Sequence, residues 1–474
     1  MNTKETMEEL LSLLDGSLTV NDGRAEVKDA AKLRTNVHKL AEVAALESGL
    51  GKGIAQYLIR LTAQTLGIIP ASIHALYIGR GSGKVPVNFS VPALNLRAMT
   101  FDSARAVFRV AQEIDAGAFI FEIARSEMGY TDQRPAEFAS SVLAAAIAEG
   151  FSGPVFIQGD HFQVSAKRFA STPETELQAV KDLIIEAIKA GFFNIDVDTS
   201  TLVDLSKTTI PEQQTLNCDL SATLSAFIRE QQPTGVTISV GGEIGEVGGH
   251  NSTEPELRAY VDGFNAALRQ KAPGAIGLSK ISIQTGTSHG GVVLPDGTIA
   301  KVSVDFDTLR NLSRVVRHDY GMGWTVQHGA STLPEDAFGK FVEYEACEVH
   351  LATNFMNILY DHLPAGLRAE MYAFLDVKDA AERKPGMTDE QFYYKTRKNA
   401  LGPFKNQLWR MDEAHKTEIS NAWEAQFRKL FHLFSQKGTR AYVERTIQPV
   451  VVPPQLKDYI GEAATEGEVS DLAD

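Results

Sequence analysis

The chain has 474 residues, of which 43% are hydrophobic and 22% charged, so it can form one large α/β barrel or two to three ordinary domains. This composition excludes wholesale disorder, and no apolar run reaches the roughly 18 residues of a membrane-spanning helix. The net charge of −14, from 46 basic and 60 acidic residues, argues against a broad nucleic-acid surface. Only two cysteines occur, and the acidic N-terminus lacks the apolar core of a secretory signal. These features predict a cytoplasmic protein that binds neither nucleic acid nor a membrane.

Three regions follow one another along the chain. Apolar residues recur at intervals of three and four in residues 1–78, which predicts a helical N-terminal extension. In residues 79–375, short β-rich segments alternate with amphipathic helical ones. Residues 376–474 are predicted to form a helical C-terminal extension with an acidic tail.

The central region contains eight candidate strands, each separated from the next by a segment long enough for a helix. They are 85–96, 117–124, 154–161, 194–200, 236–245, 280–288, 324–331 and 347–353. Eight strands that alternate with helices predict an α/β protein with a (β/α)8 TIM barrel. An open doubly wound sheet is the alternative, but it more often shows a glycine fingerprint after its first strand, and this chain has none.

Titratable side chains gather at the carboxyl ends of these strands, the rim where barrel enzymes place their active sites. They are Asp160, His161, Asp198, Glu243, His289, His328 and His350. A single histidine on a strand is more often structural than a ligand. Three imidazoles from different strands, His161, His289 and His328, match the pattern of a catalytic zinc site with an open position. Asp198 and Glu243 would orient these imidazoles or bind the metal directly.

Turns of small residues follow two of these histidines, at 287–291 and 328–331. Such turns expose backbone N–H groups to an anion, and barrels often bind phosphate after strands seven and eight. The candidate phosphate contacts are Gly290, Gly329, Ser331 and Thr353. Tight turns without a ligand are the alternative. Asn95 and Ser126, near the ends of the first two strands, are candidates for polar contacts with substrate or for structural hydrogen bonds.

Six motifs in a fixed order resemble those of the class II, zinc-dependent ketose-bisphosphate aldolases. They are VPALN (91–95), GDH (159–161), DTS (198–200), GEIGEVGG (242–249), GTSHG (286–290) and HGAS (328–331). The resemblance covers about residues 85–355, and the tail QFYYKTRKNALGPFKNQL is also similar to these enzymes. It implies a (β/α)8 barrel, Zn²⁺ and reversible aldol cleavage of a ketose bisphosphate. We expect fructose 1,6-bisphosphate as substrate, and dihydroxyacetone phosphate and glyceraldehyde 3-phosphate as products. A monovalent cation near the phosphate site and a homo-oligomer, a dimer or larger, are further expectations.

The chain departs from the family pattern at two positions. Asn251 stands where the family has an acidic loop residue that moves the C3 proton, and His350 stands where the family has asparagine. Glu254 is the favoured replacement for the missing base; Glu246 and His250 are the other candidates. These departures leave two alternatives open. One is a non-catalytic partner subunit that stabilises an aldolase, and the other is an aldolase for another phosphorylated or sulfonated ketose.

The resemblance also suggests roles for an acid and for a basic cluster. Asp160, beside His161, is placed to move the proton of the C4 oxygen, with a structural hydrogen bond as the alternative. The KTRK run (395–398) is the dense basic cluster outside the barrel. Arg397 is predicted to grip the second phosphate in a bidentate manner and Lys398 to act as a point charge. A solvated helix face is the alternative for this cluster.

Overall fold

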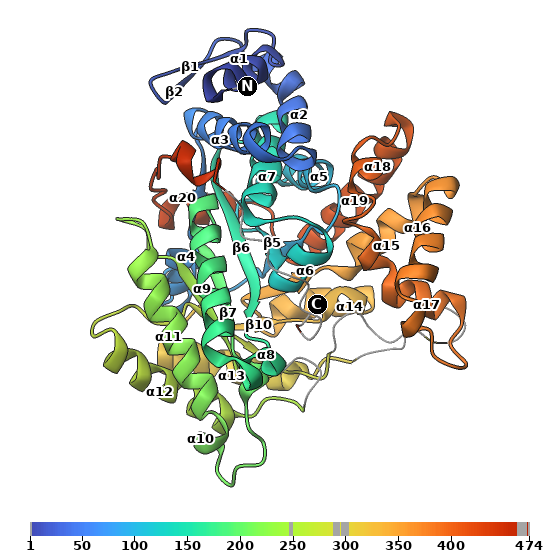
Figure 1. Cartoon of the computed structure of the whole chain (residues 1–474). Helices are drawn as coiled ribbons and strands as arrows, with labels where there is room; N and C mark the ends of the chain where they lie inside the picture. Colours follow the sequence, from blue (N-terminus) through green and yellow to red (C-terminus); the bar gives the residue numbers. More distant parts are fainter. Residues whose placement is uncertain (1, 246–249, 288–293, 295–302, 462–471, 473–474) are drawn as a thin grey trace.

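A closed barrel of eight parallel strands forms the centre of the computed structural model (Figure 1). The structure describes residues 2–245, 250–287, 294, 303–461 and 472. The barrel strands are β4 (Val91–Asn95), β5 (Ile120–Ala124), β6 (Gly153–Gln163), β7 (Asn194–Asp198), β8 (Ser239–Glu243), β9 (Lys280–Ile283), β10 (Thr325–Gln327) and β11 (Glu348–Leu351). Each pairs with the next, and β11 pairs with β4. The closure confirms the predicted (β/α)8 barrel and excludes the open sheet.

Helices connect successive strands and surround the barrel (Figure 1). The main ones are α5 (Thr100–Glu113), α7 (Pro135–Glu149), α9 (Pro173–Ala190), α11 (Thr215–Gln231), α12 (Glu254–Lys271), α13 (Phe306–Tyr320), α14 (Glu335–Glu343) and α15 (Thr353–His362). Shorter helices, α6 (Arg125–Tyr130), α8 (Ala166–Ser171) and α10 (Ile210–Gln213), lie in the loops that follow β5, β6 and β7. The local sequence explains their ends. Asp305 caps α13 by accepting a hydrogen bond from the Thr308 N–H at 3.0 Å, and Gly321 ends it with φ 67°.

The N-terminal region is helical but contains a hairpin and a further strand. Its elements are α1 (Thr3–Ser12), β1 (Leu18–Asn21), β2 (Arg24–Val27), α2 (Ala30–Leu46), α3 (Gly49–Thr65), β3 (Ile68–Ala71) and α4 (His74–Gly81). Asp22 and Gly23 form the hairpin turn with φ 47° and 73°, a left-handed conformation that suits a two-residue hairpin. β3 pairs in parallel with the beginning of β6, so this region extends the barrel sheet. The helical periodicity of residues 1–78 did not reveal these short strands, and the domain boundary at residue 78 stays a prediction.

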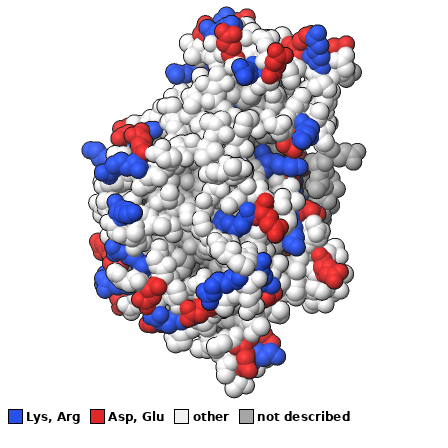
Figure 2. Space-filling model, turned by 90° about the vertical axis from the view of Figure 1, so that its left-hand side faces the viewer, with Lys and Arg blue, Asp and Glu red and all other residues white. Residues whose placement is uncertain are grey.

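The C-terminal region packs along the outside of the barrel. It comprises α16 (Ala365–Lys378), α17 (Asp389–Thr396), α18 (Lys405–Trp409), α19 (Glu413–Leu433) and α20 (Arg440–Thr446). α19 contacts both α5 and α15, and its Trp423 indole donates to the carbonyl of Phe355 at 3.0 Å. None of the helices in the described ranges is long and apolar enough to cross a membrane. On the face shown in Figure 2, acidic and basic side chains are interspersed around a largely uncharged surface.

After α20 the chain returns to the N-terminal region and contacts α3. Gln64 donates to the carbonyl of Val452 at 2.5 Å, and the rings of Tyr57 and Tyr459 meet edge to face at 6.2 Å. Gly53 leaves room for this contact, because a Cβ at this position would lie 2.0 Å from the carbonyl oxygen of Tyr459. The two ends of the described chain therefore stabilise each other.

This contact predicts opposite effects for two substitutions on the same helix. Gly53→Ala should lower the free energy of unfolding by about 1–3 kcal/mol, because the added methyl group displaces the segment around Tyr459. Gly51→Ala is the control, since a Cβ there meets no atom within 4 Å. It should be neutral or stabilise α3 by up to about 1 kcal/mol. Urea unfolding of both variants measures the difference, and equal stabilities would contradict the contact.

Candidate metal and active site

A β-bulge in β6 brings two adjacent residues to the mouth of the barrel. Gly159 pairs with Ile195 and Phe162 with Val197, so β6 contains one residue more than β7 over this stretch. His161 lies in the bulge with φ 39°. In a regular strand, neighbouring side chains point to opposite faces, whereas a bulge can redirect one of them. Asp160 and His161 consequently both contact residues of the barrel mouth.

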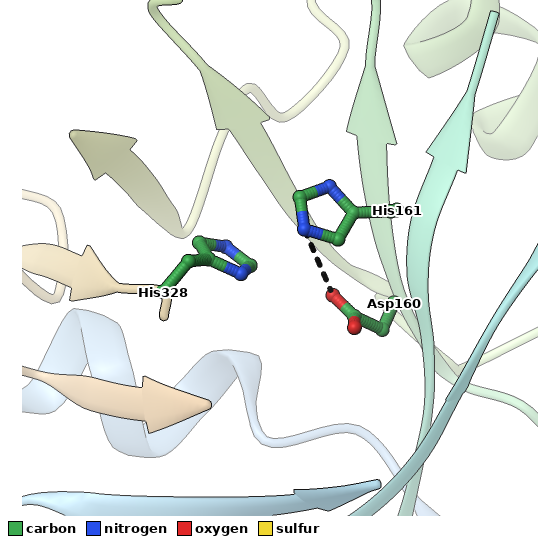
Figure 3. A group of neighbouring side chains, drawn as sticks. All are labelled: Asp160, His161 and His328. Atoms are coloured by element: carbon green, nitrogen blue, oxygen red, sulfur yellow. Dashed lines mark ion pairs between the residues drawn. The ribbon is translucent and has the colours of Figure 1, made fainter. Parts of the chain in front are cut away.

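His161 lies between carboxylates on one side and a second histidine on the other. Its Nδ1 is 3.0 Å from an oxygen of Asp198 and 3.3 Å from one of Glu243. Its Nε2 faces Asp160, 3.9 Å from Oδ1, and its ring centroid is 4.4 Å from that of His328 (Figure 3). A carboxylate that accepts from one imidazole nitrogen fixes the tautomer in which the other nitrogen can bind a metal. Two of the three predicted histidine ligands thus lie together.

Asp160 is held in place by Asn95 at the end of β4, two strands away in the barrel. Its Oδ2 accepts a hydrogen bond from Asn95 Nδ2 at 3.0 Å, and the same amide nitrogen donates to Glu127 at 2.9 Å. Glu127 in turn accepts from Arg97 Nε at 2.6 Å. Asn95 therefore orients the Asp160 carboxylate, and its predicted contact with substrate stays untested.

His350 extends the cluster toward β5 and β11. Its Nε2 forms a hydrogen bond with Glu348 at 2.7 Å. Its Nδ1 lies 3.0 Å from Oε1 of Glu122 and 3.2 Å from Oδ1 of Asp160. The ring centroids of His350 and His328 are 4.0 Å apart. The position that departs from the family asparagine therefore faces two buried carboxylates.

Beneath the mouth lies a layer of charged side chains from every second strand, an arrangement typical of barrel interiors. Glu122, Asp196, Lys280 and Glu348 come from β5, β7, β9 and β11. The ammonium group of Lys280 donates to Asp196 at 3.0 Å, to Gln158 at 2.7 Å and to Glu348. Burial lowers the pKa of Lys280, but Asp196 and Glu348 reverse this and raise it above its usual range. Lys280 is thus held as a cation and does not provide the neutral amine that an imine mechanism needs.

The described part of this region contains more acidic than basic groups. Six carboxyl groups are buried there: Glu122, Asp160, Asp196, Asp198, Glu243 and Glu348. The basic groups are Lys280 and three histidines. Burial raises the pKa of Glu122 and that of Glu243 to about 8, and the pKa of Asp196 to about 6. Each of these shifts means that a buried carboxylate needs a proton or a cation beside it.

Two of the carboxylates behave differently because basic groups surround them. Burial would raise the pKa of Asp160, but the charges of His161 and His350 hold it well below its usual range. Lys280 and His350 likewise outweigh burial and lower the pKa of Glu348 to about 2. The pKa values of His161 and His350 are raised well above the usual value by the facing carboxylates, although burial opposes this. The mouth is therefore built from strongly coupled acids and bases.

The donor atoms fit a divalent metal ion. Among the described residues, four sets of three side chains each bring their ligand atoms within 4.8 Å of one another: Asp160–His161–His328, Glu122–Asp160–His350, His161–Asp198–Glu243 and Asp196–Glu348–His350. Carboxylate oxygens and imidazole nitrogens are common ligands of Zn²⁺ and Mn²⁺. The buried Oδ1 of Asp160 makes no hydrogen bond with any described residue. Asp160 belongs to two of the four groups, so its Oδ1 is available as a metal ligand.

The loops after β10 and β11, where phosphate binding is predicted, contact each other. Ser331 Oγ accepts a hydrogen bond from the backbone N–H of Ala352 at 2.6 Å. Gly329 has φ 67°, which favours glycine at this turn, and the buried Thr353 is the first residue of α15. Thr287 supports the turn by donating to the carbonyl of His328 at 2.8 Å. Three of the four predicted phosphate contacts thus lie on one continuous edge of the mouth.

Three predicted site residues, Glu246, His289 and Gly290, lie outside the described residues. Of the other two candidates for the base, Glu254 is half-exposed on α12 and pairs with Arg258 at 2.8 Å, and His250 pairs with Glu256 at 2.7 Å. Asn251, at the position where the family has an acid, donates to Asp305 at 3.1 Å.

Within the basic cluster, Lys395 is exposed on α17 and pairs with Glu382 at 2.6 Å, whereas Arg397 and Lys398 lie against aromatic rings. Arg397 is 7% exposed, and its guanidinium stacks 4.2 Å from the ring of Tyr394 and donates to Asn357. The ammonium group of Lys398 lies 5.4 Å from the ring of Tyr130, in the helix α6 that also contains the partly buried Ser126. The segment 397–400 contacts α6 directly. Ser126, Arg397 and Lys398 are therefore brought to the same side of the barrel.

The inner charged layer was not predicted from the sequence. Asp196 precedes Asp198 by two residues, and Glu348 precedes His350 by two. Residues two apart on a strand share a face, so both pairs point into the barrel. Glu122 stands within the otherwise apolar sequence segment GAFIFEIA. A charged residue two positions before a candidate ligand on the same strand is the signal that could have revealed this layer.

Comparisons with known proteins agree with this architecture. The family model for class-II fructose-bisphosphate aldolase matches residues 86–425. A solved structure of a probable tagatose 6 phosphate kinase from Sinorhizobium meliloti 1021 is 19% identical, with a TM-score of 0.52 and coverage of 78% of this chain and 96% of that one. The fructose-bisphosphate aldolase of Campylobacter jejuni is 16% identical, with a TM-score of 0.48 and coverage of 78% and 97%.

A further solved structure is similar over a longer span. The fructuronate-tagaturonate epimerase from Cohnella laeviribosi is 11% identical, with a TM-score of 0.52, and the match covers 89% of this chain and 90% of that one. Because this coverage exceeds the family match, the likeness includes part of the terminal extensions. At such identities these structures show the fold alone. A search of curated proteins finds no significant match.

The charged layer predicts a large effect for one buried lysine. Lys280→Met should lower the free energy of unfolding by about 3–5 kcal/mol, because it leaves Asp196 and Glu348 buried without their cation. Lys271→Met is the control, since Lys271 pairs with Asp219 at 2.8 Å on the surface and should cost no more than about 1 kcal/mol. Urea unfolding compares the two, and a similar cost for both would show that the barrel does not depend on Lys280.

Proposed function

Because the chain belongs to the class-II fructose-bisphosphate aldolase family, we propose that it cleaves a ketose bisphosphate by a metal-dependent aldol reaction at the mouth of its barrel. The substrate we propose is fructose 1,6-bisphosphate, and the products are dihydroxyacetone phosphate and glyceraldehyde 3-phosphate. The observation that carries the proposal is the convergence of Asp160, His161 and His328 within the matched region (Figure 3). We further propose that the enzyme works in the cytoplasm as a homo-oligomer.

His161, His328 and His289 would hold the ion, which we propose to be Zn²⁺. A divalent ion bound there supplies a Lewis acid that stabilises the negative charge developing on the carbonyl oxygen of the substrate. Asp198 and Glu243 accept from His161 Nδ1 and so orient its Nε2 toward the site, 3.9 Å from Asp160 Oδ1. These two carboxylates are also able to bind the ion themselves, because they form a ligand group with His161.

Asp160 would receive the proton of the C4 hydroxyl as the carbon–carbon bond breaks. Its low pKa keeps it ionised at neutral pH, which is the state a proton acceptor needs. Asn95 fixes the carboxylate by donating to Oδ2, so Oδ1 faces the histidines. The burial of Asp160, at 4% exposure, keeps bulk water from competing for the transferred proton.

The proton at C3 of dihydroxyacetone phosphate requires a second base, which we place on the loop that leads into α12. Glu254 remains the first candidate, and it must leave Arg258 to act. Glu246 is the second candidate. Loops after barrel strands can move by several ångströms on closure over substrate, so an ion pair on the surface does not prevent this role.

The two phosphates would bind on opposite sides of the mouth. We propose that the first contacts Gly290, Gly329, Ser331 and Thr353, where the N-terminus of α15 has no side-chain cap. A monovalent cation near this phosphate would help to balance its charge. Arg397 and Lys398 would bind the second phosphate, with Asn95 and Ser126 as polar contacts between the two. His350 would then help to decide which ketose is accepted.

The non-catalytic alternative, a subunit that stabilises another aldolase, makes a different demand on these residues. A purely stabilising barrel gains nothing from six buried carboxylates around three histidines, because such groups cost free energy unless cations or protons accompany them. This cost favours the catalytic proposal. An aldolase for another phosphorylated or sulfonated ketose keeps the same machinery and differs only in the residues that contact the sugar.

The main test is cleavage of fructose 1,6-bisphosphate by the purified chain, measured as release of dihydroxyacetone phosphate. We expect chelation to abolish it and Zn²⁺ to restore it. His161→Ala and His328→Ala should each lose activity and bound metal, since each removes one protein ligand. His318→Ala, an exposed histidine on α13, is the matched control and should keep both. Release of dihydroxyacetone phosphate that survives chelation would contradict the metal-dependent reaction.

Exchange of the C3 proton with solvent separates the two bases. Glu254→Gln should suppress exchange, whereas Asp160→Asn should retain exchange and lower kcat for cleavage by about 10²–10⁴-fold. Glu246→Gln is measured in parallel. Loss of exchange in Glu246→Gln alone would move the base to that residue. Exchange at the wild-type rate in both glutamate variants would leave His250 as the candidate on this loop.

A further inference from the structure

We infer that the barrel mouth holds a second divalent cation, bound by Glu122, Asp160 and His350. This site is distinct from the one formed by His161 and His328, although the two share Asp160. The inference concerns binding and does not depend on the aldol reaction proposed above.

Three ligand atoms converge on this site without forming a hydrogen bond. Oε1 of Glu122, Oδ1 of Asp160 and Nδ1 of His350 are all buried, and none has a hydrogen-bond partner among the described residues. Nδ1 of His350 nevertheless lies 3.0 Å from the glutamate oxygen and 3.2 Å from the aspartate oxygen. Burial of polar atoms in this state is costly unless a further group satisfies them.

The other polar atom of each ligand side chain forms a hydrogen bond with a neighbouring side chain. Oε2 of Glu122 accepts from Gln158 at 2.8 Å, and Oδ2 of Asp160 accepts from Asn95 at 3.0 Å. Nε2 of His350 forms a hydrogen bond with Glu348 at 2.7 Å. Nδ1 is therefore the ring nitrogen of His350 that faces the two carboxylate oxygens. Metal-binding histidines characteristically donate their other ring N–H to a carboxylate in this way.

The distances agree with ligands of one ion. Two atoms that each lie about 2.1 Å from an ion, at right angles, are about 3.0 Å apart, and in a tetrahedral site they are about 3.4 Å apart. The separations of 3.0 and 3.2 Å fall in this range. The lone pairs of neighbouring ligands point at the ion and not at each other. This explains why atoms so close together do not meet hydrogen-bond geometry.

The adjacent group of Asp196, Glu348 and His350 provides an internal comparison. There the ammonium group of Lys280 contacts both carboxylates and supplies the positive charge. At Glu122, Asp160 and His350, no lysine or arginine among the described residues pairs with the converging atoms. A metal cation would supply the positive charge here, as the ammonium group of Lys280 does between Asp196 and Glu348. Two oxygens and one imidazole nitrogen suit Mn²⁺, Fe²⁺ or Zn²⁺.

Sharing Asp160 would make the two ions a bridged pair. In two-metal sites, such ions lie about 3.5–4 Å apart. An ion on Oδ1 leaves Oδ2, the oxygen that accepts from Asn95, as the atom of Asp160 that can still receive a proton. Occupation of the second site would thus change the environment of the acid that we assign to cleavage.

Metal stoichiometry tests the inference. After removal of metal by chelation, the full-length wild-type chain is dialysed against Mn²⁺, and bound metal is measured by mass spectrometry. We expect two ions per chain in the wild type and one in both Glu122→Gln and His350→Asn. Glu137→Gln removes a buried carboxylate that pairs with Lys52 and Lys405 elsewhere, and it should keep two ions. His328→Ala should lose the other ion and keep this one.

A wild-type chain that binds one ion, or a Glu122→Gln variant that binds as many as the wild type, would overturn the second site. If the variants do not fold, electron paramagnetic resonance of the wild type decides, because Mn²⁺ ions that share a carboxylate are magnetically coupled. A coupled spectrum supports the pair, and the six-line spectrum of isolated Mn²⁺ at saturation overturns it. Failure of the aldolase proposal would look different, since both ions would bind while no ketose bisphosphate is cleaved.

Discussion

The burial of six carboxylates in one barrel is the constraint on which the rest of the site depends. A buried carboxylate is costly unless a cation or a proton accompanies it. Lys280 pairs with Asp196 and Glu348, and His161 pairs with Asp198 and Glu243. Because Asp198 and Glu243 face Nδ1 of His161, its Nε2 is directed toward Asp160. The electrostatic balance of the barrel thus orients the atoms that would bind metal.

Backbone geometry also positions these groups. The bulge in β6 directs both Asp160 and His161 into the mouth, where one faces His350 and the other faces Asp198. Gly241 of β8 contributes by its small size, because a Cβ there would lie 2.2 Å from an oxygen of Asp196. The proposed chemistry therefore rests on one irregular strand and one glycine-containing strand within an otherwise regular barrel.

The sequence predicted the barrel because each strand and helix carries its own local signal, and residues at strand ends must share one rim of a closed barrel. It also placed His161 and His328 together for that reason. It did not reveal the inner layer, since Lys280 and Glu122 stand within apolar segments and their partners lie on distant strands. The burial of Arg397 against Tyr394 was equally inaccessible, because a basic run on a helix does not show which side packs. Long-range pairing and packing decided these points.

The central claim is that the carboxylates and histidines of the barrel mouth hold divalent metal. Anomalous diffraction from crystals of the chain soaked in Zn²⁺, recorded on both sides of the zinc absorption edge, tests it most directly. The account predicts a strong peak between His161, His328 and Asp160, with a second peak beside Glu122 and His350. Bound zinc that produces peaks only on the outer surface of the barrel would contradict it.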